Sequence, residues 1–207
     1  MKFTIPIFPL NLVVFPDSKY PLHIFEESYK ILIQKCLLAN SGFGIVASID
    51  KKLSDVGVYV KITDVLKTYL NGEMDILVKG IERFFINSTS LHPDGYYLSD
   101  IEKYDDENVI VDPRLKDELQ TEFEEIIELA SYKLEDTFWQ NLKNAELKSF
   151  KFAEKSGLAL DKQQELLMLK NENERLSFLI NYFISIKNKV SSAESIKKII
   201  MNDGYLN

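Results

Sequence analysis

Turn-forming residues are concentrated in the first half of this chain, and this asymmetry constrains the fold more than any other feature. Six of the eight glycines and five of the six prolines lie before residue 112. Frequent breakers between short runs of β-branched residues are typical of strands, whereas long stretches without breakers are typical of helices. The sequence therefore predicts an α+β protein, with a β-rich subdomain over residues 1–111 and a helical-bundle subdomain over residues 112–207.

The β-rich part contains several short apolar runs bounded by turn residues. Their lengths and alternation predict strands and one helix. The strands are expected near 3–8, 10–15, 20–25, 43–49, 56–70, 73–87 and 96–104, and the helix near 26–40.

A hairpin is expected around Asn71-Gly72, because Asn-Gly accepts the positive φ angles of a two-residue type I′ turn. That turn pairs Tyr69 with Met74 and Val65 with Val78. Upstream of the turn, the apolar alternation changes phase at Asp64. This change predicts a β-bulge in a long, curving strand.

The second part begins with Asp112-Pro113, which resembles an N-cap followed by proline at the first helical position. Apolar residues then recur at helical spacing. Further helices are expected at 137–143 and 145–156. Capping-box patterns predict three more helices, starting at Asp161, Asn171 and Ser191.

Charge and cysteine content exclude several classes of function. The net charge of −7 is spread evenly, with −4 over residues 1–111 and −3 over residues 112–207, so nucleic acid is a disfavoured partner. Cys36 is the single cysteine, which excludes an internal disulfide and fits a reducing, cytoplasmic location. With two histidines far apart in sequence, no metal site or cofactor is expected. No apolar run reaches the 18 or so residues of a membrane span, so no membrane contact is expected.

Three segments carry a resemblance to a known family, in the family's order. The first runs from Ile5-Pro6 to Pro21-Leu22-His23-Ile24-Phe25-Glu26. The second, Leu77-Val78-Lys79-Gly80-Ile81-Glu82-Arg83-Phe84, follows the hairpin. The third extends from Asp161-Lys-Gln-Gln to Asn173-Glu174-Arg175-Leu176. Together they make the chain similar to the N-terminal, substrate-binding domain of Lon proteases. Their residues and spacing resemble those of free-standing Lon-domain proteins.

The resemblance implies a twisted β pseudo-barrel like that of PUA domains, followed by a helical bundle. It also implies binding of unfolded or specific protein partners, as an adaptor or regulator of proteolysis. The sequence has no Gly-x-x-x-x-Gly-Lys-Ser/Thr phosphate loop, and its 207 residues leave no room for the ATPase and Ser-Lys peptidase domains. We therefore expect a non-catalytic module that does not use ATP.

Five aromatic residues at turns or strand ends are candidates for a polypeptide-binding surface, with core packing as the alternative for each. They are Phe15, Tyr20, Tyr69, Tyr96 and Tyr97. His23 is interpreted as a structural histidine that shares a strand face with Phe25. Glu82 and Arg83, beside Gly80, are interpreted as a structural ion pair or a cap on the barrel.

Two other functions are alternatives, and the sequence disfavours both. PUA-like barrels bind RNA, so RNA binding is the main alternative, although the acidic charge disfavours it. A small-molecule site of the kind found in a zinc-bearing relative would need a cysteine cluster, and one cysteine does not supply it.

Overall fold

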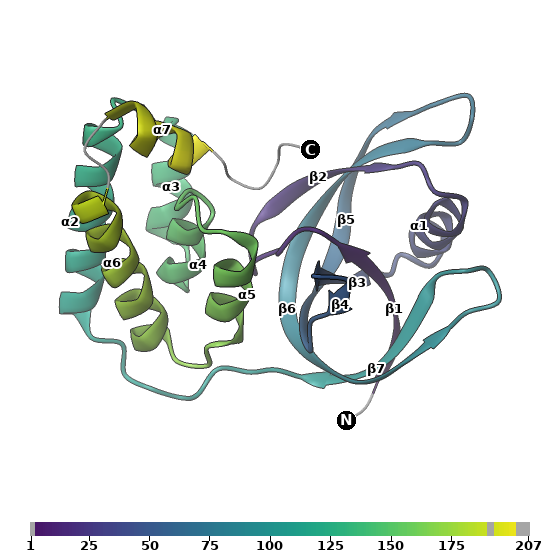
Figure 1. Ribbon diagram of the computed structural model, residues 1–207. Helices are drawn as coiled ribbons and strands as arrows, with labels where there is room; N and C mark the ends of the chain where they lie inside the picture. Colours follow the sequence, from purple (N-terminus) through teal and green to yellow (C-terminus); the bar gives the residue numbers. More distant parts are fainter. Residues whose placement is uncertain (1–2, 190–192, 202–207) are drawn as a thin grey trace. The chain divides into compact units, whose positions relative to one another are not determined.

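The computed structural model describes residues 3–189 and 193–201 (Figure 1). The chain divides into two compact units, one ending at Asp105 and one beginning at Asp106. We call them the sheet unit and the helical unit and describe each by itself. The subdomain boundary after residue 111 stays a prediction.

The sheet unit contains seven strands and one helix in its described part. Their bounds are β1 Phe3–Leu10, β2 Lys19–Ile24, α1 Glu27–Ala39, β3 Phe43–Ile49, β4 Lys52–Leu53, β5 Val56–Thr68, β6 Met74–Leu91 and β7 Tyr97–Lys103.

The strands close into a ring. Neighbours follow the order β1-β7-β6-β5-β3-β4, and β1 also pairs with β3 in parallel, so the first and fifth strands of this path meet (Figure 1). The strand β2 is not part of this strand order and pairs with β6. The prediction of an α+β chain, with a twisted β structure followed by a helical bundle, is confirmed, and the expected pseudo-barrel takes the form of a ring of strands.

The interior of the ring is apolar. Ile7, Val46, Phe84 and Ile101 are buried together there. Two glycines leave room for the Phe84 ring, because a Cβ on Gly44 or Gly57 would lie 2.6 or 2.7 Å from its tip. These small residues on neighbouring strands therefore fix the position of the largest side chain in this cluster.

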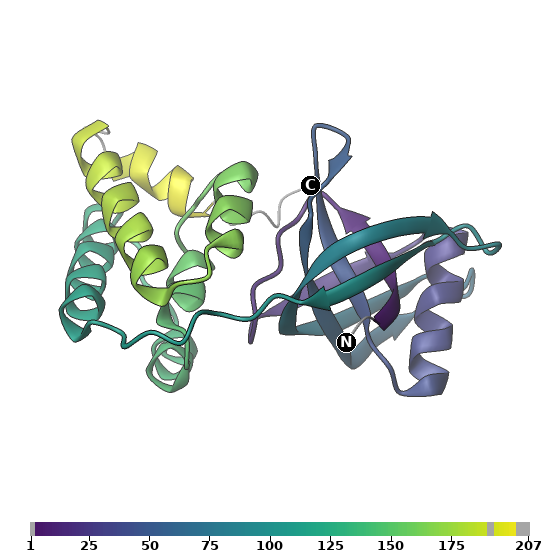
Figure 2. The same cartoon turned by 90° about the horizontal axis from the view of Figure 1, so that it is seen from below.

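The helix α1 packs beside the ring (Figure 2). The rings of Phe8 in β1 and Tyr29 in α1 stack with their centroids 3.9 Å apart. Burial in this contact raises the pKa of Tyr29 to about 12. Cys36 on the same helix is buried, which raises the pKa of its thiol.

The predicted strand at 10–15 is wrong. The strand β1 ends at Leu10, and the following residues form a buried loop containing Val13, Val14 and Phe15. This loop crosses β6 at Gly80: Asp17 N donates to Gly80 O (2.9 Å), and Gly80 N donates to Ser18 O (2.9 Å). The end of the loop thus exchanges backbone hydrogen bonds with β6 at a crossing, without joining the sheet as a strand.

The hairpin is present, but its predicted register is wrong. Gly72 is the one residue of this turn with positive φ (81°), and Gly72 N donates to Tyr69 O (3.0 Å). This is a three-residue loop with Gly72 in the left-handed position, instead of a type I′ turn, which needs two such residues. Thr68 therefore pairs with Met74, and Val65 pairs with Ile76.

The bulge predicted near Asp64 is confirmed by a register shift between Ile62 and Asp64. A second shift follows between Val65 and Lys67. Two irregularities within six residues twist the far end of the hairpin more strongly than a regular ladder would.

The described part of the helical unit contains six helices. Their bounds are α2 Pro113–Leu129, α3 Asp136–Asn144, α4 Lys148–Ala153, α5 Leu160–Met168, α6 Glu172–Lys189 and α7 Ala193–Met201. The core is centred on Phe123, whose ring lies between 5.1 and 6.2 Å from four other aromatic rings. Those rings belong to Phe138, Trp139, Phe152 and Phe183.

Helix starts follow the predicted caps in two of three described cases. The Asp112 carboxylate accepts from Arg114 N (2.9 Å), and the Asn171 side chain accepts from Asn173 N (3.0 Å). The predicted cap at Asp161 is wrong, because α5 already begins at Leu160 and Asp161 lies in its first turn. The predicted cap at Ser191 lies outside the described residues.

A buried polar network is built around Arg175. Its guanidinium donates to Asp106 Oδ1 (2.8 Å), Glu172 Oε2 (3.0 Å) and Ser149 Oγ (3.1 Å), and its side chain is fully buried. These contacts join α4 and α6 to the segment that precedes α2. The arginine of the Asn-Glu-Arg-Leu motif is thus structural.

Candidate functional site

The five aromatic candidates differ in exposure. Phe15, Tyr20 and Tyr96 are buried. Tyr69 is partly buried, and Tyr97 is 38% exposed. A polypeptide-binding surface on this structure therefore has access to Tyr69 and Tyr97 and not to the other three rings.

The buried candidates have structural contacts. The hydroxyl of Tyr20 accepts from Phe15 N (3.2 Å), which holds the loop that crosses β6. The ring of Tyr96 stacks on His92, with centroids 4.4 Å apart. Lys35 Nζ donates to the Tyr96 hydroxyl (3.3 Å), so this ring ties the β6–β7 turn to α1.

Several exposed apolar side chains lie on and beside the β5–β6 hairpin, which projects beyond the ring in Figure 1. We call residues 62–77 the hairpin arm. Leu66 is 58% exposed, and Leu70 at the tip is fully exposed. Phe25, which follows β2 on the neighbouring chain segment, is 60% exposed. Exposed apolar groups that gather on one element are typical of interaction surfaces.

His23 links Phe25 to the hairpin arm. Its ring stacks on Phe25 (centroids 6.0 Å apart) and meets the edge of Tyr69 (5.8 Å). His23 Nδ1 lies 2.7 Å from Asp75 Oδ1, and the Tyr69 hydroxyl donates to Asp75 Oδ2 (2.8 Å). The hydrogen bond with His23, followed by that with Tyr69, lowers the pKa of Asp75. The carboxylate thus fixes the orientation of both rings, in agreement with a structural role for His23.

A side chain of α1 contacts the turn of the hairpin arm and stabilises it. Lys30 Nζ donates to Asn71 O (3.1 Å) and pairs with Glu27 Oε1 (2.5 Å). Lys67 Nζ lies 4.2 Å from the centroid of the Tyr69 ring. The apolar side chains of the arm are therefore displayed on a braced hairpin.

One edge of the hairpin arm is open among the described strands. The strand β5 pairs with β3 only at Val58–Val60, so its later residues pair with β6 alone. An open edge accepts an added strand, but bulges discourage regular pairing. The two register shifts in the arm therefore favour recognition through side chains over extended backbone pairing.

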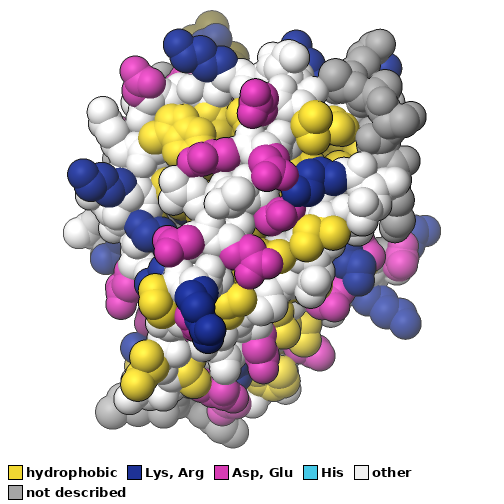
Figure 3. Space-filling view, turned by 90° about the vertical axis from the view of Figure 1, so that its left-hand side faces the viewer, with side chains coloured by type: hydrophobic (Ala, Val, Ile, Leu, Met, Phe, Trp, Pro, Cys, Tyr) yellow, Lys and Arg dark blue, Asp and Glu magenta, His cyan; other side chains and the backbone are white. Residues whose placement is uncertain are grey.

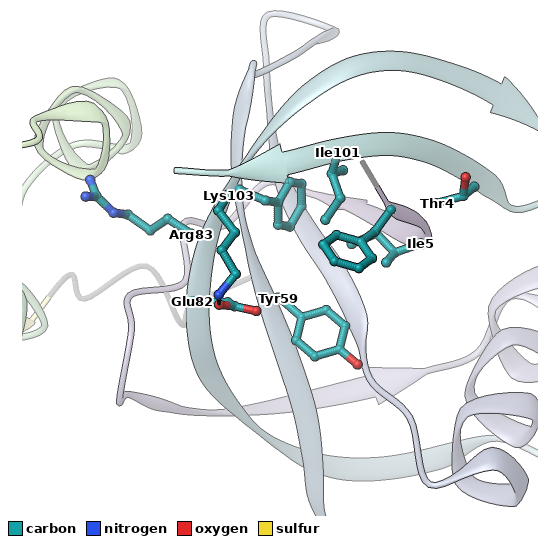
Figure 4. A pocket seen from close by; sticks show the side chains of 9 residues that line it. Thr4, Ile5, Tyr59, Glu82, Arg83, Ile101 and Lys103 are labelled. Atoms are coloured by element: carbon teal, nitrogen blue, oxygen red, sulfur yellow. Dashed lines mark ion pairs between the residues drawn. The ribbon is translucent and has the colours of Figure 1, made fainter. Parts of the chain in front are cut away.

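A pocket of about 360 Å³ opens at the mouth of the strand ring (Figure 4). Its apolar lining comes from β1, β5, β6 and β7. The residues are Phe3, Ile5, Tyr59, Phe84 and Ile101. Glu82 and Lys103 pair at the rim, 3.1 Å apart.

The expected roles of Glu82 and Arg83 are corrected in one respect. Glu82 forms its ion pair with Lys103 across the β6–β7 ladder. The Arg83 guanidinium instead lies 5.1 Å from the centroid of the Tyr104 ring. Adjacent strand residues point to opposite faces, so a Glu82–Arg83 pair is geometrically disfavoured.

Sequence reasoning missed Phe25, Leu66 and Leu70, and it missed the pocket. The hairpin signal carried information on Leu70, because a leucine at the tip of a turn has no core to face. The pocket has no comparable local signal, because its walls come from four strands.

Within residues 3–189 and 193–201, no group of three or more His, Cys, Asp and Glu side chains is placed to hold a metal ion. No helix in the same ranges has the length and apolar character needed to cross a membrane.

Comparison with known proteins identifies the family. The family model described as the ATP-dependent protease La (LON) substrate-binding domain matches residues 4–188. The chain is 25% identical over 193 residues to the Lon protease of Buchnera aphidicola subsp. Acyrthosiphon pisum (strain APS). That match covers 86% of this chain and 24% of the relative, so the chain spans about a quarter of the length of the curated relative.

Two solved structures share the fold. A Lon N-terminal domain protein from Xanthomonas campestris superposes with a TM-score of 0.68 at 21% identity, covering 86% of this chain and 98% of that one. The N-terminal domain of a Mycobacterium avium complex Lon protease gives a TM-score of 0.64 at 16% identity, covering 88% and 98%. On the family match over most of its length, this chain belongs to the Lon substrate-binding domain family.

Proposed function

We propose that this chain is a non-catalytic module that binds unfolded or specific polypeptides, as an adaptor or regulator of proteolysis. The observation that carries the proposal is the exposed apolar surface of the hairpin arm together with Phe25. Burial of such side chains by a partner is favourable. The bracing of the arm by Lys30 and Asp75 lowers the cost of ordering it on binding. Family membership makes polypeptide the favoured partner class.

The absence of catalysis is supported by the chemistry of the side chains. The sequence contains no phosphate-loop motif for ATP. Cys36, the one thiol, is buried, and burial raises its pKa, which is opposite to the shift that a nucleophile needs. The single thiol also fits action in the reducing cytoplasm.

Charge disfavours the alternative of RNA binding. The chain carries 32 acidic and 25 basic side chains. On the face of the helical unit shown in Figure 3, acidic and basic side chains are interspersed, without a basic stripe. A phosphate backbone is recognised mainly through clustered Lys and Arg.

The proposal is tested by titrating the purified chain into two fluorescein-labelled probes, a reduced and carboxymethylated unfolded polypeptide and a single-stranded RNA. Anisotropy is read at low and high salt. The proposal predicts polypeptide binding that persists at high salt, and weaker binding by Tyr69→Ala. Salt-sensitive RNA binding without polypeptide binding contradicts it.

A second readout tests the non-catalytic part. The same polypeptide is incubated with the chain, with and without Mg-ATP, and its length is followed on a gel. The polypeptide is expected to stay intact in both cases. Proteolytic activity that stays with the chain through purification contradicts this part of the proposal.

A further inference from the structure

We propose that the pocket at the ring mouth is a second binding site, separate from the hairpin arm, which takes one apolar side chain flanked by a cationic residue in an extended polypeptide. This inference rests on the proposed function, because it names the kind of segment that the module recognises. It goes beyond that function by assigning a site to residues of β1, β5, β6 and β7.

The lining of the pocket suits an apolar side chain. Phe84 and Ile101 are buried and form the floor, while Phe3 at the start of β1 is 47% exposed and forms a wall. In Figure 4, the side chains of Ile5, Tyr59 and Ile101 converge on the same space. A volume of about 360 Å³ lies at the small end of the range for ligand pockets. The site therefore fits a side chain or two and not a folded surface.

The walls are preformed. The β1–β7 pairing places Phe3 opposite Ile101, and the β5–β6 pairing places Tyr59 opposite Glu82. The Tyr59 hydroxyl accepts from Gly42 N (2.7 Å), which holds this ring in place. A pocket built on hydrogen-bonded strands needs little ordering when a ligand enters, so most of the burial contributes to affinity.

The rim selects for positive charge beside the apolar group. A shallow hollow of about 420 Å³ adjoins the pocket and shares Phe3 and Lys103 with it, and Glu102 and Asp105 complete its lining. Together the pocket and the hollow are lined by three acidic residues, Glu82, Glu102 and Asp105, and by two basic residues, Arg83 and Lys103. Lys103 is paired with Glu82, which raises its pKa. Figure 4 shows the Arg83 side chain directed away from the rim. The excess negative charge complements a Lys or Arg next to the anchor residue.

The test uses three fluorescein-labelled decapeptides with a Gly-Ser background. One carries Phe flanked by two Lys, the second carries Phe flanked by two Glu, and the third carries Ala flanked by two Lys. The first is expected to bind the full chain at least about tenfold more tightly than either of the others, because it alone supplies both the apolar anchor and the cations.

Two variants locate the site. Phe3→Ala removes a pocket wall, and the double variant Glu102→Lys, Asp105→Lys reverses charge at exposed positions of the rim. Each is expected to weaken binding of the Lys-Phe-Lys peptide by about tenfold. The matched controls are Ile110→Ala, an exposed apolar position outside both the pocket and the hairpin arm, and Glu118→Lys with Glu128→Lys, which changes net charge equally on the exposed side of α2. Both controls should leave binding of this peptide unchanged.

The outcomes separate the two proposals. Unfolded-polypeptide binding that is lost in Tyr69→Ala, with no preference among the decapeptides, overturns the pocket and leaves the proposed function standing. Peptide binding that is weakened equally by Ile110→Ala and Phe3→Ala overturns the assignment to the pocket. The double rim variant keeps the test decisive if Phe3→Ala proves unfolded by circular dichroism. Absence of binding to every probe overturns both.

Discussion

The carbonyl oxygen of Phe15 lies against the backbone of Gly80, where a Cβ on residue 80 would sit 2.2 Å from it. Two backbone hydrogen bonds fasten the loop at this crossing, from Asp17 N to Gly80 O and from Gly80 N to Ser18 O. The glycine of the Val-x-Gly motif is thus required for a close approach of two backbones, and not for an unusual φ. This contact joins the first family segment to the second.

Gly80→Ala is therefore expected to destabilise the sheet unit by about 2 kcal/mol or more, because overpacking against backbone leaves no flexible side chain to move. Urea unfolding followed by far-UV circular dichroism measures the loss. The control is Gly95→Ala, where φ is +88° but the nearest atom, Ser28 Cβ, is 3.4 Å from the added Cβ. That change should cost about 1 kcal/mol through the backbone alone. A Gly80→Ala variant no less stable than Gly95→Ala contradicts the crossing.

Arg175→Ala is expected to destabilise the helical unit by about 3–5 kcal/mol, because it leaves Glu172 and Asp106 without their buried cation. Trp139, the one tryptophan, lies in α3 and reports unfolding of this unit through its fluorescence. Arg114→Ala is the control, since the Arg114–Asp112 pair is solvent-exposed and such pairs contribute about 0–1 kcal/mol. Similar losses in the two variants would mean that the Arg175 network is not structural.

Alkaline pH is expected to destabilise the helical unit through Tyr182. Burial raises the pKa of this phenol to about 12, and its hydroxyl donates to Gly157 O (2.9 Å). The unfolded value is near 10. A raised folded pKa gives stability that is fully present below about pH 10 and is lost as pH rises towards 12. Trp139 unfolding curves of the wild type should show this decline, and Tyr182→Phe should show a smaller one. An equal decline in both would assign the effect to other groups.

Leu66→Ser with Leu70→Ser is expected to weaken binding of the unfolded polypeptide by about tenfold, since it removes two exposed apolar groups from the hairpin arm. Stability should change little, because both positions are exposed. Ile110→Ser is the control, as Ile110 is 95% exposed but belongs to the helical unit. Equal binding by all three proteins would remove the arm from the proposed surface.

Local chemistry in the sequence was sufficient for the class of fold and for most elements. Asp112-Pro113 marked a helix start because its side chain and ring act within one turn, and Asn171 did so for the same reason. Errors arose where tertiary contacts decide. Val13, Val14 and Phe15 have the residue types of a strand, but their burial depends on a crossing with Gly80, 65 residues beyond Phe15. The hairpin register shifted because Asn71 does not take the positive φ that it tolerates.

Tertiary contacts also limited the prediction of the candidate site. Aromatic residues at strand ends are exposed or buried according to what lies opposite them. Tyr20 lies in a strand that pairs with β6 at Val78, and Tyr96 contacts Lys35 of α1, so both rings meet elements that are distant in sequence. Tyr69 follows the last residue of β5 and Tyr97 is the first residue of β7, so both lie at the ends of hairpins, where they retain exposure. The side chains that define the arm and the pocket are ordinary apolar residues, and only the ring of strands groups them.

Amide hydrogen exchange is the decisive test of whether the hairpin arm and its neighbours bind unfolded polypeptide. Exchange is measured for the full chain, alone and with saturating reduced, carboxymethylated polypeptide. With polypeptide bound, we expect slower exchange in residues 62–77 and in the segment that contains Phe25, with little change in α2–α6. Protection confined to the helical unit, or no protection under conditions where anisotropy shows binding, would contradict it.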